Sequence, residues 1–514
     1  MKRVVVVGNG MAGSRVVDEL LARDDQLHVT VFGAERHAAY NRVLLSSVLA
    51  GAATVDDIRL GPDHSANDRL VVRTGVTVRR IDRARRLVVG HDGTRATYDV
   101  LVLATGSSAR VPPIAGLVRD GGLIPGAAVF RTVDDCHEIL AATTSADRAV
   151  VVGGGLLGLE AARGLAARGL DVEVLHHTGH LMERQLDPLA GKVLARTLAD
   201  LGVRVRLAAS AVAVEGADRV KGVRLADGEL LPAELVVLAC GVRPEVTLAK
   251  AAGLAVDHGV VVDDELRSVS DQEVYAIGEC AQHDGQVYGL VAPAWEQARV
   301  VADRVSGVDP TAIYTGSRVV TRLKAAGVDL ATMGETHADA DAEAEVVQFS
   351  DPARGTYKKV VIRDDRLVGA ILLGEIGTVG TVTQLFDRQS PVPRDRLTLL
   401  FSGRWSVAPA ENPAHIPDRT TICQCNGVTK GAITRCWLAG AGTVADVVAE
   451  TRATTGCGTC RPTVEGIVEW LAAADPEMKR RADEQAKWST ADRAAPPRSP
   501  AEGARSASAT LGIA

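Results

Sequence analysis

The chain has 514 residues, 46% hydrophobic and 24% charged, which is enough for about three domains with cores of their own. Its 58 basic and 64 acidic residues are well mixed and give a net charge of -6, which argues against nucleic acid or an anionic membrane as a partner. No run approaches the roughly 18 apolar residues of a membrane span, and the short apolar start lacks the layout of a signal peptide, so we expect a cytoplasmic protein.

The chain opens with the pattern of a βαβ unit, in which a β-branched apolar strand leads through glycines into a helix and then a second strand. Gly8, Gly10 and Gly13 form a GxGxxG motif between the first strand and the helix. The first glycine permits the turn, the second lets the backbone approach a pyrophosphate, and the third lets helix and strand pack closely. Glu35, after the second strand, is placed to bind a ribose. GxGxxG alone also occurs in plain turns, but this context predicts a dinucleotide site.

A second unit of the same design lies at residues 148–177, and its glycines are Gly153, Gly155 and Gly158. It predicts a second nucleotide-binding domain. The ribose-reading position after its second strand is His176, followed by His177. A carboxylate there would bind the ribose of NAD and repel the extra phosphate of NADP, and no arginine stands beside it to hold that phosphate. The choice between the two cofactors therefore stays open, and we favour NADH. The alternative is that both histidines are surface residues without a ligand.

Strand and turn patterns at 98–116 and 234–245 follow the two units, and a strand, a loop and a helix come after them at 274–305. This order predicts that the first domain resumes once the second is complete. We expect the first domain to cover residues 1–115 and 244–310, and the second to cover residues 116–243.

Five motifs in this order resemble the two-dinucleotide-fold flavoprotein reductases: GNGMAG (8–13), AYNRVLLS (39–46), LATG (103–106), GGGLLGLE (153–160) and YAIGEC (275–280). The resemblance implies an α/β fold with two Rossmann-like domains, FAD in the interrupted first domain and a nicotinamide cofactor in the inserted second. It places Arg42 at the flavin cofactor, Thr105 and Gly106 along its site, Glu279 on the ribityl chain and Glu160 near the nicotinamide. The alternatives are that Arg42 and Glu160 are solvated helix residues and that Thr105 is a plain turn.

Two departures from the family concern cysteine and charge. Disulfide reductases of this type keep a cysteine pair on the first helix of the FAD domain, and the related peroxidases and oxidases keep one cysteine after the second strand. The first cysteine of this sequence is Cys136, so electrons must leave the flavin by another route. Ser47 stands where many ferredoxin reductases have lysine, which leaves the charge around the flavin open. We expect the isolated Cys136, Cys240, Cys280 and Cys436 to be packed as apolar residues.

The pattern of apolar and polar residues changes after residue 310. Residues 311–406 contain a hairpin pattern with a DD turn and a helix near 378–389, which predicts a small α+β domain. A polar link follows at 407–419. Residues 484–514 are rich in Ala, Ser, Pro and Arg and lack apolar periodicity, so we expect this tail to be disordered.

Two close cysteine pairs lie near the end of the chain: Cys423 with Cys425, and, after 31 residues, Cys457 with Cys460. Four thiolates could hold zinc or a 2Fe-2S cluster, or form disulfides. We favour the cluster, because a C-x-C pair is tight around a single ion whereas each of two irons takes two thiolates. Helical patterns follow both pairs, so helix N-termini would face the anionic cluster. The motif CNGVTKG and this spacing resemble the bacterioferritin-associated-ferredoxin type of 2Fe-2S domain, a small helical module expected at residues 420–472.

The combination predicts an order of electron carriers. NAD(P)H gives up two electrons as hydride, a 2Fe-2S cluster accepts one at a time, and FAD can do both. Hydride transfer depends on positioning, so we assign no general base. The full arrangement, residues 1–472, resembles the large subunit of NAD(P)H-dependent nitrite reductases and the electron-transfer subunit of assimilatory nitrate reductases. The sequence lacks the four further cysteines of a sirohaem and 4Fe-4S module, so we expect a separate terminal reductase subunit or electron carrier, such as nitrate or nitrite reductase, to receive the electrons.

Two other functions fit parts of the sequence. The chain could be the subunit of an FAD enzyme that oxidises an amine or opine and carries a cluster, which needs no nicotinamide site. It could also be a binding module whose cluster senses iron or oxygen. The oligomeric state is open, a homo-oligomer included.

Overall fold

The computed structural model describes residues 2–61, 67–323, 325, 327–341, 343–401, 413, 416–423, 426–455 and 460–474. The chain divides into two compact units, of which the larger holds residues 1–409 and 424–427 and the smaller holds residues 410–423 and 428–514. No helix in the described ranges has both the length and the apolar composition needed to cross a membrane. The predicted link at 407–419 lies partly, and the predicted tail at 484–514 wholly, outside the described residues.

The first sheet of the larger unit has eight strands drawn from two distant parts of the chain. In order they are β23 (Ala281–His283), β20 (Val260–Val262), β21 (Arg267–Ser268), β22 (Asp271–Ala276), β7 (Val100–Leu103), β1 (Lys2–Val7), β2 (Leu27–Gly33) and β3 (Leu70–Thr74). The strands β1, β2, β3, β7 and β22 run parallel, and β22 pairs directly with β7. The chain therefore returns to this sheet after the inserted domain, which confirms the predicted interrupted architecture.

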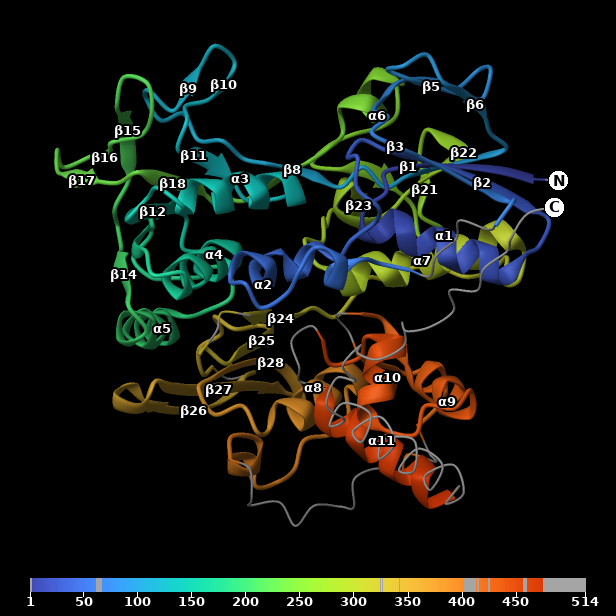
Figure 1. Ribbon diagram of the computed structural model, residues 1–514. Coiled ribbons are helices and arrows are strands. Elements are labelled where there is room, and N and C mark those ends of the chain that lie inside the picture. The colour runs from blue at the N-terminus through green and yellow to red at the C-terminus, as the bar shows by residue number, and fades with distance from the viewer. Residues whose placement is uncertain are drawn as a thin grey trace, which may run out of the picture. The chain divides into compact units, whose positions relative to one another are not determined.

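Two long helices pack side by side on this first sheet, α1 (Met11–Arg23) and α7 (Val291–Ser306) (Figure 1). Their buried faces include Val16, Leu20, Ala298 and Val301, which join the apolar strand residues in one core. A small antiparallel sheet of β4 (Val78–Asp82), β5 (Leu87–Gly90) and β6 (Arg95–Thr97) adjoins this domain, together with the short helix α6 (Thr247–Ala251). The parallel strands thus bring the glycine turn after β1 and the loop after β7 to the same edge of the sheet.

The second sheet has five strands, all parallel: β11 (Ala127–Val129), β18 (Leu235–Leu238), β12 (Arg148–Val152), β13 (Asp171–Leu175) and β14 (Val203–Arg206). Successive residues of its central strand face opposite sides, as in any β-strand. Val151 packs into the core under the helices, and Val150 packs into a separate core beneath a three-stranded antiparallel sheet. That sheet is formed by β15 (Ala211–Glu215), β16 (Gly222–Leu225) and β17 (Leu230–Pro232). This doubly covered parallel sheet explains the continuous apolar runs of its strands.

The helices of the second sheet's first face are α3 (Val133–Thr143), α4 (Leu156–Ala167) and α5 (Pro188–Asp200). The short helix α2 (Leu45–Leu49), which belongs to the first segment of the chain, packs against α3 and α4 (Figure 1). Two crossing strands, β8 (Ser107–Ala109) and β19 (Val242–Pro244), pair antiparallel where the chain enters and leaves the inserted domain. A further two-stranded pair, β9 (Val118–Arg119) and β10 (Gly122–Leu123), lies beside the three-stranded sheet, where the Arg119 guanidinium donates to the Gly216 carbonyl just after β15 over 2.9 Å.

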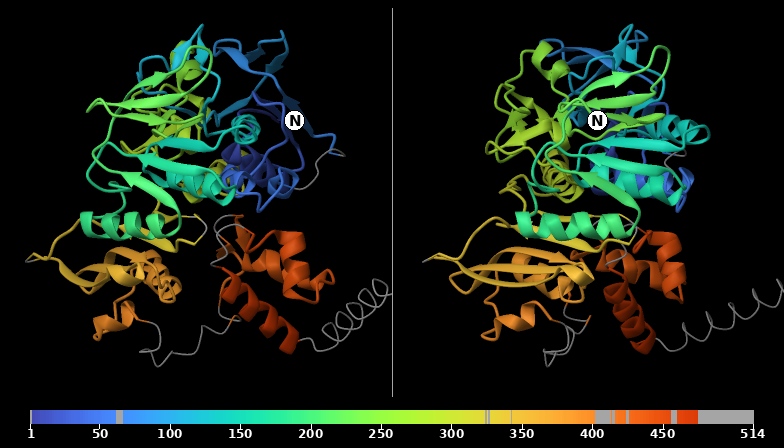
Figure 2. Two further views of the ribbon diagram at one scale, coloured as in Figure 1. Left: turned by 60° about the vertical axis from the view of Figure 1, so that its left-hand side comes forward. Right: turned by 90° about the vertical axis from the view of Figure 1, so that its left-hand side faces the viewer.

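A small α+β domain completes the larger unit. Its sheet runs β24 (Val320–Leu323), β25 (Leu330–Gly334), β28 (Arg366–Leu373), β27 (Thr356–Arg363) and β26 (Glu345–Asp351), and its helix is α8 (Val379–Arg388). Asp364 and Asp365 both have positive φ, 48° and 55°, which is the two-residue hairpin turn predicted for the DD pair. Helix α5 lies against this sheet (Figure 2), and the Tyr357 hydroxyl donates to the Asp187 carboxylate over 2.5 Å.

The smaller unit is mainly helical, as the sequence predicted for the cysteine module. It contains a strand pair, β29 (Thr421–Cys423) and β30 (Val428–Thr429), and the helices α9 (Lys430–Leu438), α10 (Val444–Thr451) and α11 (Arg461–Ala474). Lys430, from the motif that suggested this domain, is buried. Its Nζ donates to the Ile416 carbonyl over 2.8 Å and lies 5.1 Å from the centre of the Trp470 ring.

Candidate dinucleotide sites and cluster module

In the first glycine turn, two of the three glycines lie against backbone and the third lies against a side chain. Gly8 has φ +116°, and a Cβ on it would lie 2.0 Å from the Ala104 carbonyl oxygen. A Cβ on Gly13 would lie 1.9 Å from the oxygen of Gly8. Gly10 is different, because its nearest neighbour is the Arg42 Nε at 3.7 Å. On the side where a pyrophosphate would bind, the N-terminus of α1 therefore meets the end of the Arg42 side chain rather than backbone, whereas any larger residue at Gly8 or Gly13 would deform the turn.

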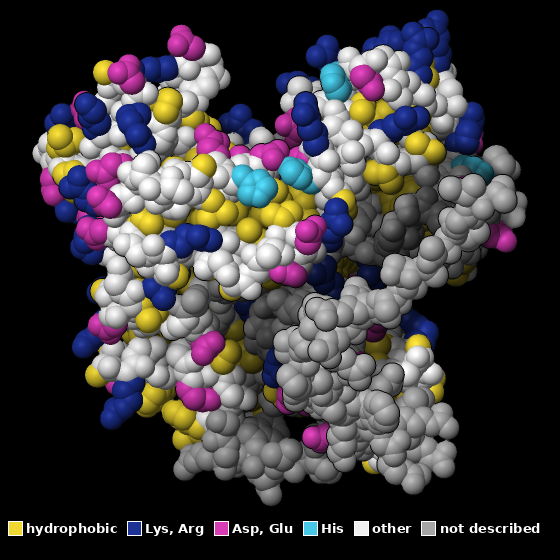
Figure 3. Space-filling model, in the orientation of Figure 1, with side chains coloured by type: hydrophobic (Ala, Val, Ile, Leu, Met, Phe, Trp, Pro, Cys, Tyr) yellow, Lys and Arg dark blue, Asp and Glu magenta, His cyan; other side chains and the backbone are white. Residues whose placement is uncertain are grey.

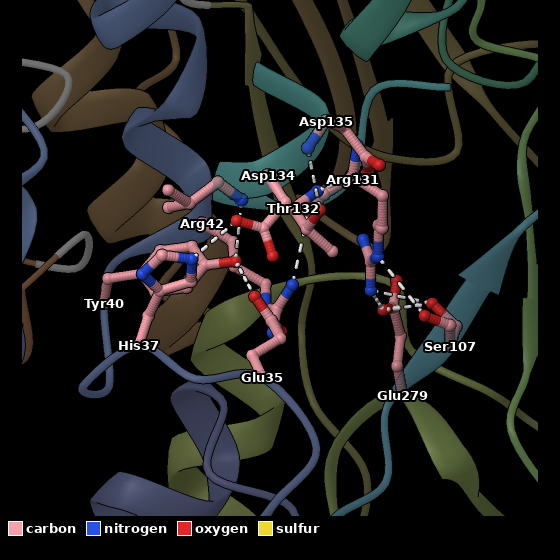
Figure 4. Close-up of polar contacts among 11 residues, drawn as sticks. Glu35, His37, Tyr40, Arg42, Ser107, Arg131, Thr132, Asp134, Asp135 and Glu279 are labelled. Carbon is pink, nitrogen blue, oxygen red and sulfur yellow. Dashed lines mark hydrogen bonds and ion pairs between the residues drawn. The ribbon is translucent and has the colours of Figure 1, made fainter. Parts of the chain in front are cut away.

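Three side chains form a network beside this turn (Figure 4). The Tyr40 hydroxyl donates to Glu35 over 2.6 Å, and Arg42 forms an ion pair with the same carboxylate. The Tyr40 oxygen also accepts a hydrogen bond from the Val133 backbone over 3.1 Å, and burial raises the pKa of its hydroxyl. Glu35 is therefore held as an acceptor at the end of β2, the position from which a carboxylate binds a ribose, with Arg42 between it and Gly10.

A second network in Figure 4 joins Ser107 of β8, Arg131 just before α3 and Glu279 after β22. Glu279, in the turn after β22, accepts hydrogen bonds from the Ser107 hydroxyl over 2.6 Å and from the Arg131 guanidinium, with which it forms an ion pair. Arg131 also donates to the Ser107 hydroxyl over 2.7 Å. The Glu279 side chain is only 17% exposed, so its charge is compensated almost wholly by Arg131.

Thr105 and Gly106 form the turn after β7. The Thr105 hydroxyl donates to the Glu245 carbonyl over 2.7 Å, and Gly106 has φ +70° with open space where a Cβ would stand. Cys280 lies beneath this turn, with its sulfur 3.5 Å from the Leu103 carbonyl oxygen, and burial raises its pKa. The turn thus combines a fixed threonine with an open glycine, an arrangement that lets a flat ring approach the backbone.

The second glycine turn repeats the construction of the first. Gly153 has φ +120°, and its Cβ would lie 2.2 Å from the Ala239 oxygen; a Cβ on Gly158 would lie 1.9 Å from the oxygen of Gly153. Gly155, at the N-cap of α4, has no atom within 4 Å of the place of a Cβ. The residues present therefore fit a second dinucleotide, because the one glycine that must admit the pyrophosphate is the one with open space.

His176 is buried, with 3% of its surface exposed, so the alternative of two surface histidines is wrong for this residue; His177 is exposed. The His176 Nδ1 accepts a hydrogen bond from the Gly154 backbone over 3.1 Å, and the His176 Nε2 lies 3.0 Å from a Glu183 carboxylate oxygen. Burial is the main cause that lowers the pKa of His176. Glu160 is also buried, in the second turn of α4.

Two of the four predicted cluster ligands are described. Cys423 is buried at the end of β29, and Cys460 is buried immediately before α11, where its carbonyl accepts from the Val464 backbone over 2.9 Å. Cys425 and Cys457 lie outside the described residues. No group of three or more potential metal-ligating side chains converges within the described part, which holds only half of the predicted set.

The isolated cysteines are packed largely as predicted. Cys136 and Cys280 are fully buried, and Cys240 and Cys436 are half-buried. Burial raises the pKa of all four thiols, to about 11 for Cys136. They are therefore protonated at neutral pH and poorly suited to act as thiolate nucleophiles.

Three residues of these sites escaped the sequence analysis: Tyr40, Arg131 and Glu183. Tyr40 lies inside a quoted motif, and the capping box Thr132/Asp135 after Arg131 marks a helix start that could have drawn attention to it. Glu183 lies in the loop between β13 and α5 and carries no local signal of a contact with His176.

Comparison with known proteins places these sites in a family. Residues 2–298 match the pyridine nucleotide-disulphide oxidoreductase family, residues 320–389 the rubredoxin NAD+ reductase C-terminal domain, and residues 421–470 the BFD-like [2Fe-2S] binding domain. The chain therefore belongs to the pyridine nucleotide-disulphide oxidoreductases and carries a [2Fe-2S] module. These matches confirm the predicted enzyme class, its FAD and nicotinamide cofactors and the choice of a 2Fe-2S cluster over zinc or disulfides.

Particular relatives are similar along most of the chain. Nitrite reductase [NAD(P)H] of Bacillus subtilis is 38% identical over 92% of this chain and 58% of its own length. The assimilatory nitrate reductase electron transfer subunit of the same organism is 37% identical over 92% of this chain and 60% of its own length. The chain thus spans about three-fifths of these relatives. Among solved structures, the covalent putidaredoxin reductase-putidaredoxin complex has a TM-score of 0.69 and 26% identity, covering 76% of this chain and 94% of that one.

Proposed function

We propose that this protein oxidises NAD(P)H and passes the electrons, one at a time, through its 2Fe-2S cluster to a separate acceptor, an assimilatory nitrate or nitrite reductase. The observation that carries the proposal is the repeated glycine turn, in which both times the outer two glycines lie against backbone and the middle one does not, on a chain that also carries a [2Fe-2S] binding domain. Two dinucleotide sites and a one-electron centre need a carrier that changes two-electron into one-electron transfer, and a bound FAD supplies that chemistry.

The residues have distinct roles in this proposal. Gly10 and Gly155 admit the two pyrophosphates to the N-termini of α1 and α4, and Glu35 accepts hydrogen bonds from the first ribose while Arg42 meets the phosphates. The FAD site comprises Gly8, Gly10, Gly13, Glu35, Arg42, Thr105, Gly106 and Glu279. The nicotinamide site comprises Gly153, Gly155, Gly158, Glu160 and His176. The cluster ligands are Cys423, Cys425, Cys457 and Cys460.

Several features support a separate protein as the acceptor. The FAD domain, residues 1–115 and 244–310, has one cysteine in its sequence, the packed and protonated Cys280, so it offers no thiol pair to receive electrons. A relative similar over 92% of the chain is named as an electron transfer subunit of an assimilatory nitrate reductase. The Lys and Arg side chains lie among Asp and Glu over much of the face in Figure 3, in keeping with a protein partner rather than nucleic acid. A reducing compartment, the cytoplasm, would keep the four ligand cysteines available for the cluster.

An anaerobic titration tests the proposal. Addition of NADH or NADPH to the purified protein should bleach the flavin absorbance and then produce the electron paramagnetic resonance signal of a reduced 2Fe-2S cluster. Mixing the reduced protein with an assimilatory nitrate reductase and nitrate should restore the oxidised spectrum and form nitrite. If the acceptor is instead a nitrite reductase, mixing the reduced protein with that enzyme and nitrite should restore the oxidised spectrum and consume nitrite. A flavin that neither nucleotide bleaches would refute the proposal and favour an amine-oxidising or sensing role. Bleaching without electron delivery to either reductase would refute the assigned acceptor alone.

A further inference from the structure

The nicotinamide domain has a histidine at the position where Rossmann units that bind NAD usually have a carboxylate. In a Rossmann unit the residue after the second strand reads the adenosine ribose, and a carboxylate there favours NAD over NADP. Here that residue is His176, which follows β13, and its ring is turned inward under the glycine turn. A Cβ on Gly154 would lie 2.7 Å from the ring's Cγ, so the turn and the ring are in direct contact. The nearest acidic partner of that ring is Glu183, seven residues further along the chain.

The hydrogen bonds around His176 define its protonation. Nδ1 accepts from the Gly154 N–H over 3.1 Å, so this nitrogen carries no proton. The Thr178 hydroxyl, 2.7 Å from Nε2, donates its own proton to the His180 carbonyl over 3.0 Å, so it can only accept from the ring. The carboxylate of Glu183 can also only accept. The hydrogen therefore resides on Nε2, and a neutral imidazole donates it towards Glu183 and Thr178.

The backbone around Glu183 is anchored to the same turn. The Met182 N–H donates to the Gly154 carbonyl over 3.0 Å, and the Leu181 side chain packs against Gly154. From the other side, the His337 Nε2 donates to the Glu183 carbonyl over 2.9 Å. The carboxylate thus has a fixed backbone below it and a hydrogen-bond donor beside it, while 31% of its side chain is exposed.

The charge at this position is negative. Among the described residues, no Lys or Arg is a hydrogen-bond or ion-pair partner of His176 or Glu183. Arg184 follows Glu183 and is exposed, so it is the one neighbouring cation in sequence that could meet a phosphate. A ribose hydroxyl can donate to the Glu183 carboxylate, whereas the extra phosphate of NADPH can only accept and is repelled by it.

We propose that Glu183, oriented by the neutral His176, is the carboxylate that makes this site prefer NADH to NADPH. Glu183 takes over the selecting role from the position after β13, and His176 acts as its positioning residue. This inference rests on the proposed function, since it concerns the nicotinamide site of the same enzyme.

Stopped-flow reduction of the flavin in the full-length protein tests the inference, with NADH and NADPH compared in wild type and in E183Q. The wild type should react with a higher kcat/KM for NADH. In E183Q the ratio of kcat/KM for NADH to that for NADPH should fall at least about tenfold, or about 1.4 kcal/mol. E215Q is the matched control, because it removes one partly exposed carboxylate from β15 of the same domain, and its ratio should stay unchanged. A general loss of folding would lower kcat/KM for both nucleotides alike and leave their ratio unaltered.

Two further variants separate the roles of the neighbours. H176N keeps an acceptor for the Gly154 N–H, but its shorter side chain does not place a donor where the His176 Nε2 stands beside Glu183, so the ratio should fall by a smaller factor than in E183Q. R184Q should leave the ratio unaltered. An unchanged ratio in a folded, FAD-containing E183Q, a wild type that prefers NADPH, or a loss of NADPH reactivity in R184Q would overturn the inference while the proposed function stands. A flavin that neither nucleotide reduces would overturn both.

Discussion

Gly155→Ala separates the folding of the nicotinamide domain from its ability to bind a dinucleotide. The Cβ would meet no protein atom within 4 Å, and the backbone φ of -84° is one that alanine adopts. Alanine at an N-cap lowers the stability of the folded state by about 0.5 kcal/mol relative to glycine. Alanine also restricts the unfolded chain more than glycine does, which restores about the same amount of stability. The free energy of unfolding should therefore change by less than about 0.5 kcal/mol. The same methyl would occupy the space through which a pyrophosphate approaches the backbone.

The assay is the reduction of the flavin by NADH under anaerobic conditions. We expect the KM for NADH to rise at least about tenfold, equivalent to about 1.4 kcal/mol, while dithionite still reduces the flavin normally. The control is Gly153→Ala, in which the Cβ would lie 2.2 Å from the Ala239 oxygen at φ +120°. That variant should be destabilised by about 3 kcal/mol or more and yield little folded protein. A G155A protein with unchanged KM would refute the assignment of this turn to the pyrophosphate.

The other predictions concern the cluster, the partly buried ion pair of Arg131 with Glu279, and pH. C423S should lose iron and acid-labile sulfide but keep FAD, whereas C436S, from the same module, should keep all three; equal iron content in both variants would contradict the ligand assignment. R131M leaves the Glu279 carboxylate without its cationic partner and should lower the free energy of unfolding in urea by about 1–3 kcal/mol, a loss that an unchanged midpoint would disprove. Burial keeps His176 neutral when folded, whereas the unfolded histidine binds a proton below its ordinary pKa of 6.5, so the wild type should lose stability as the pH falls below that value. H176N lacks this proton uptake, so its stability deficit relative to the wild type should narrow between about pH 7.5 and pH 5.5, and a constant deficit would argue against the neutral imidazole.

Local patterns predicted the elements that carry the sites. The strand, glycine turn and helix of each βαβ unit depend on residues adjacent in the chain. In both turns the outer two glycines lie against backbone and the middle one does not, as the motif requires. The hairpin with its DD turn and the helices α9 and α11, which follow the two cysteine pairs, are predicted for the same reason, because turn chemistry and helical periodicity are properties of short segments.

The surroundings of the predicted site residues could not be predicted in the same way. Arg131 reaches Glu279 across 148 residues of chain, and the Tyr40 hydroxyl meets the Val133 backbone across 93. His176 occupies the ribose-reading position in the sequence, but only its packing under Gly154 shows that its ring faces inward. Such contacts depend on how a helix or loop packs over a sheet, and no spacing within a segment encodes that.

The sequence by itself determined the kind of chemistry: two glycine turns, four paired cysteines and the order of the domains that carry them. Those features depend on backbone conformations and ligand spacings that neighbouring residues dictate. Only the tertiary structure decided which charges face each other, including the placement of Glu183 against the neutral His176. Selectivity between nearly identical nucleotides depends on a few ångströms between side chains, and those distances are set by packing between segments remote in the chain.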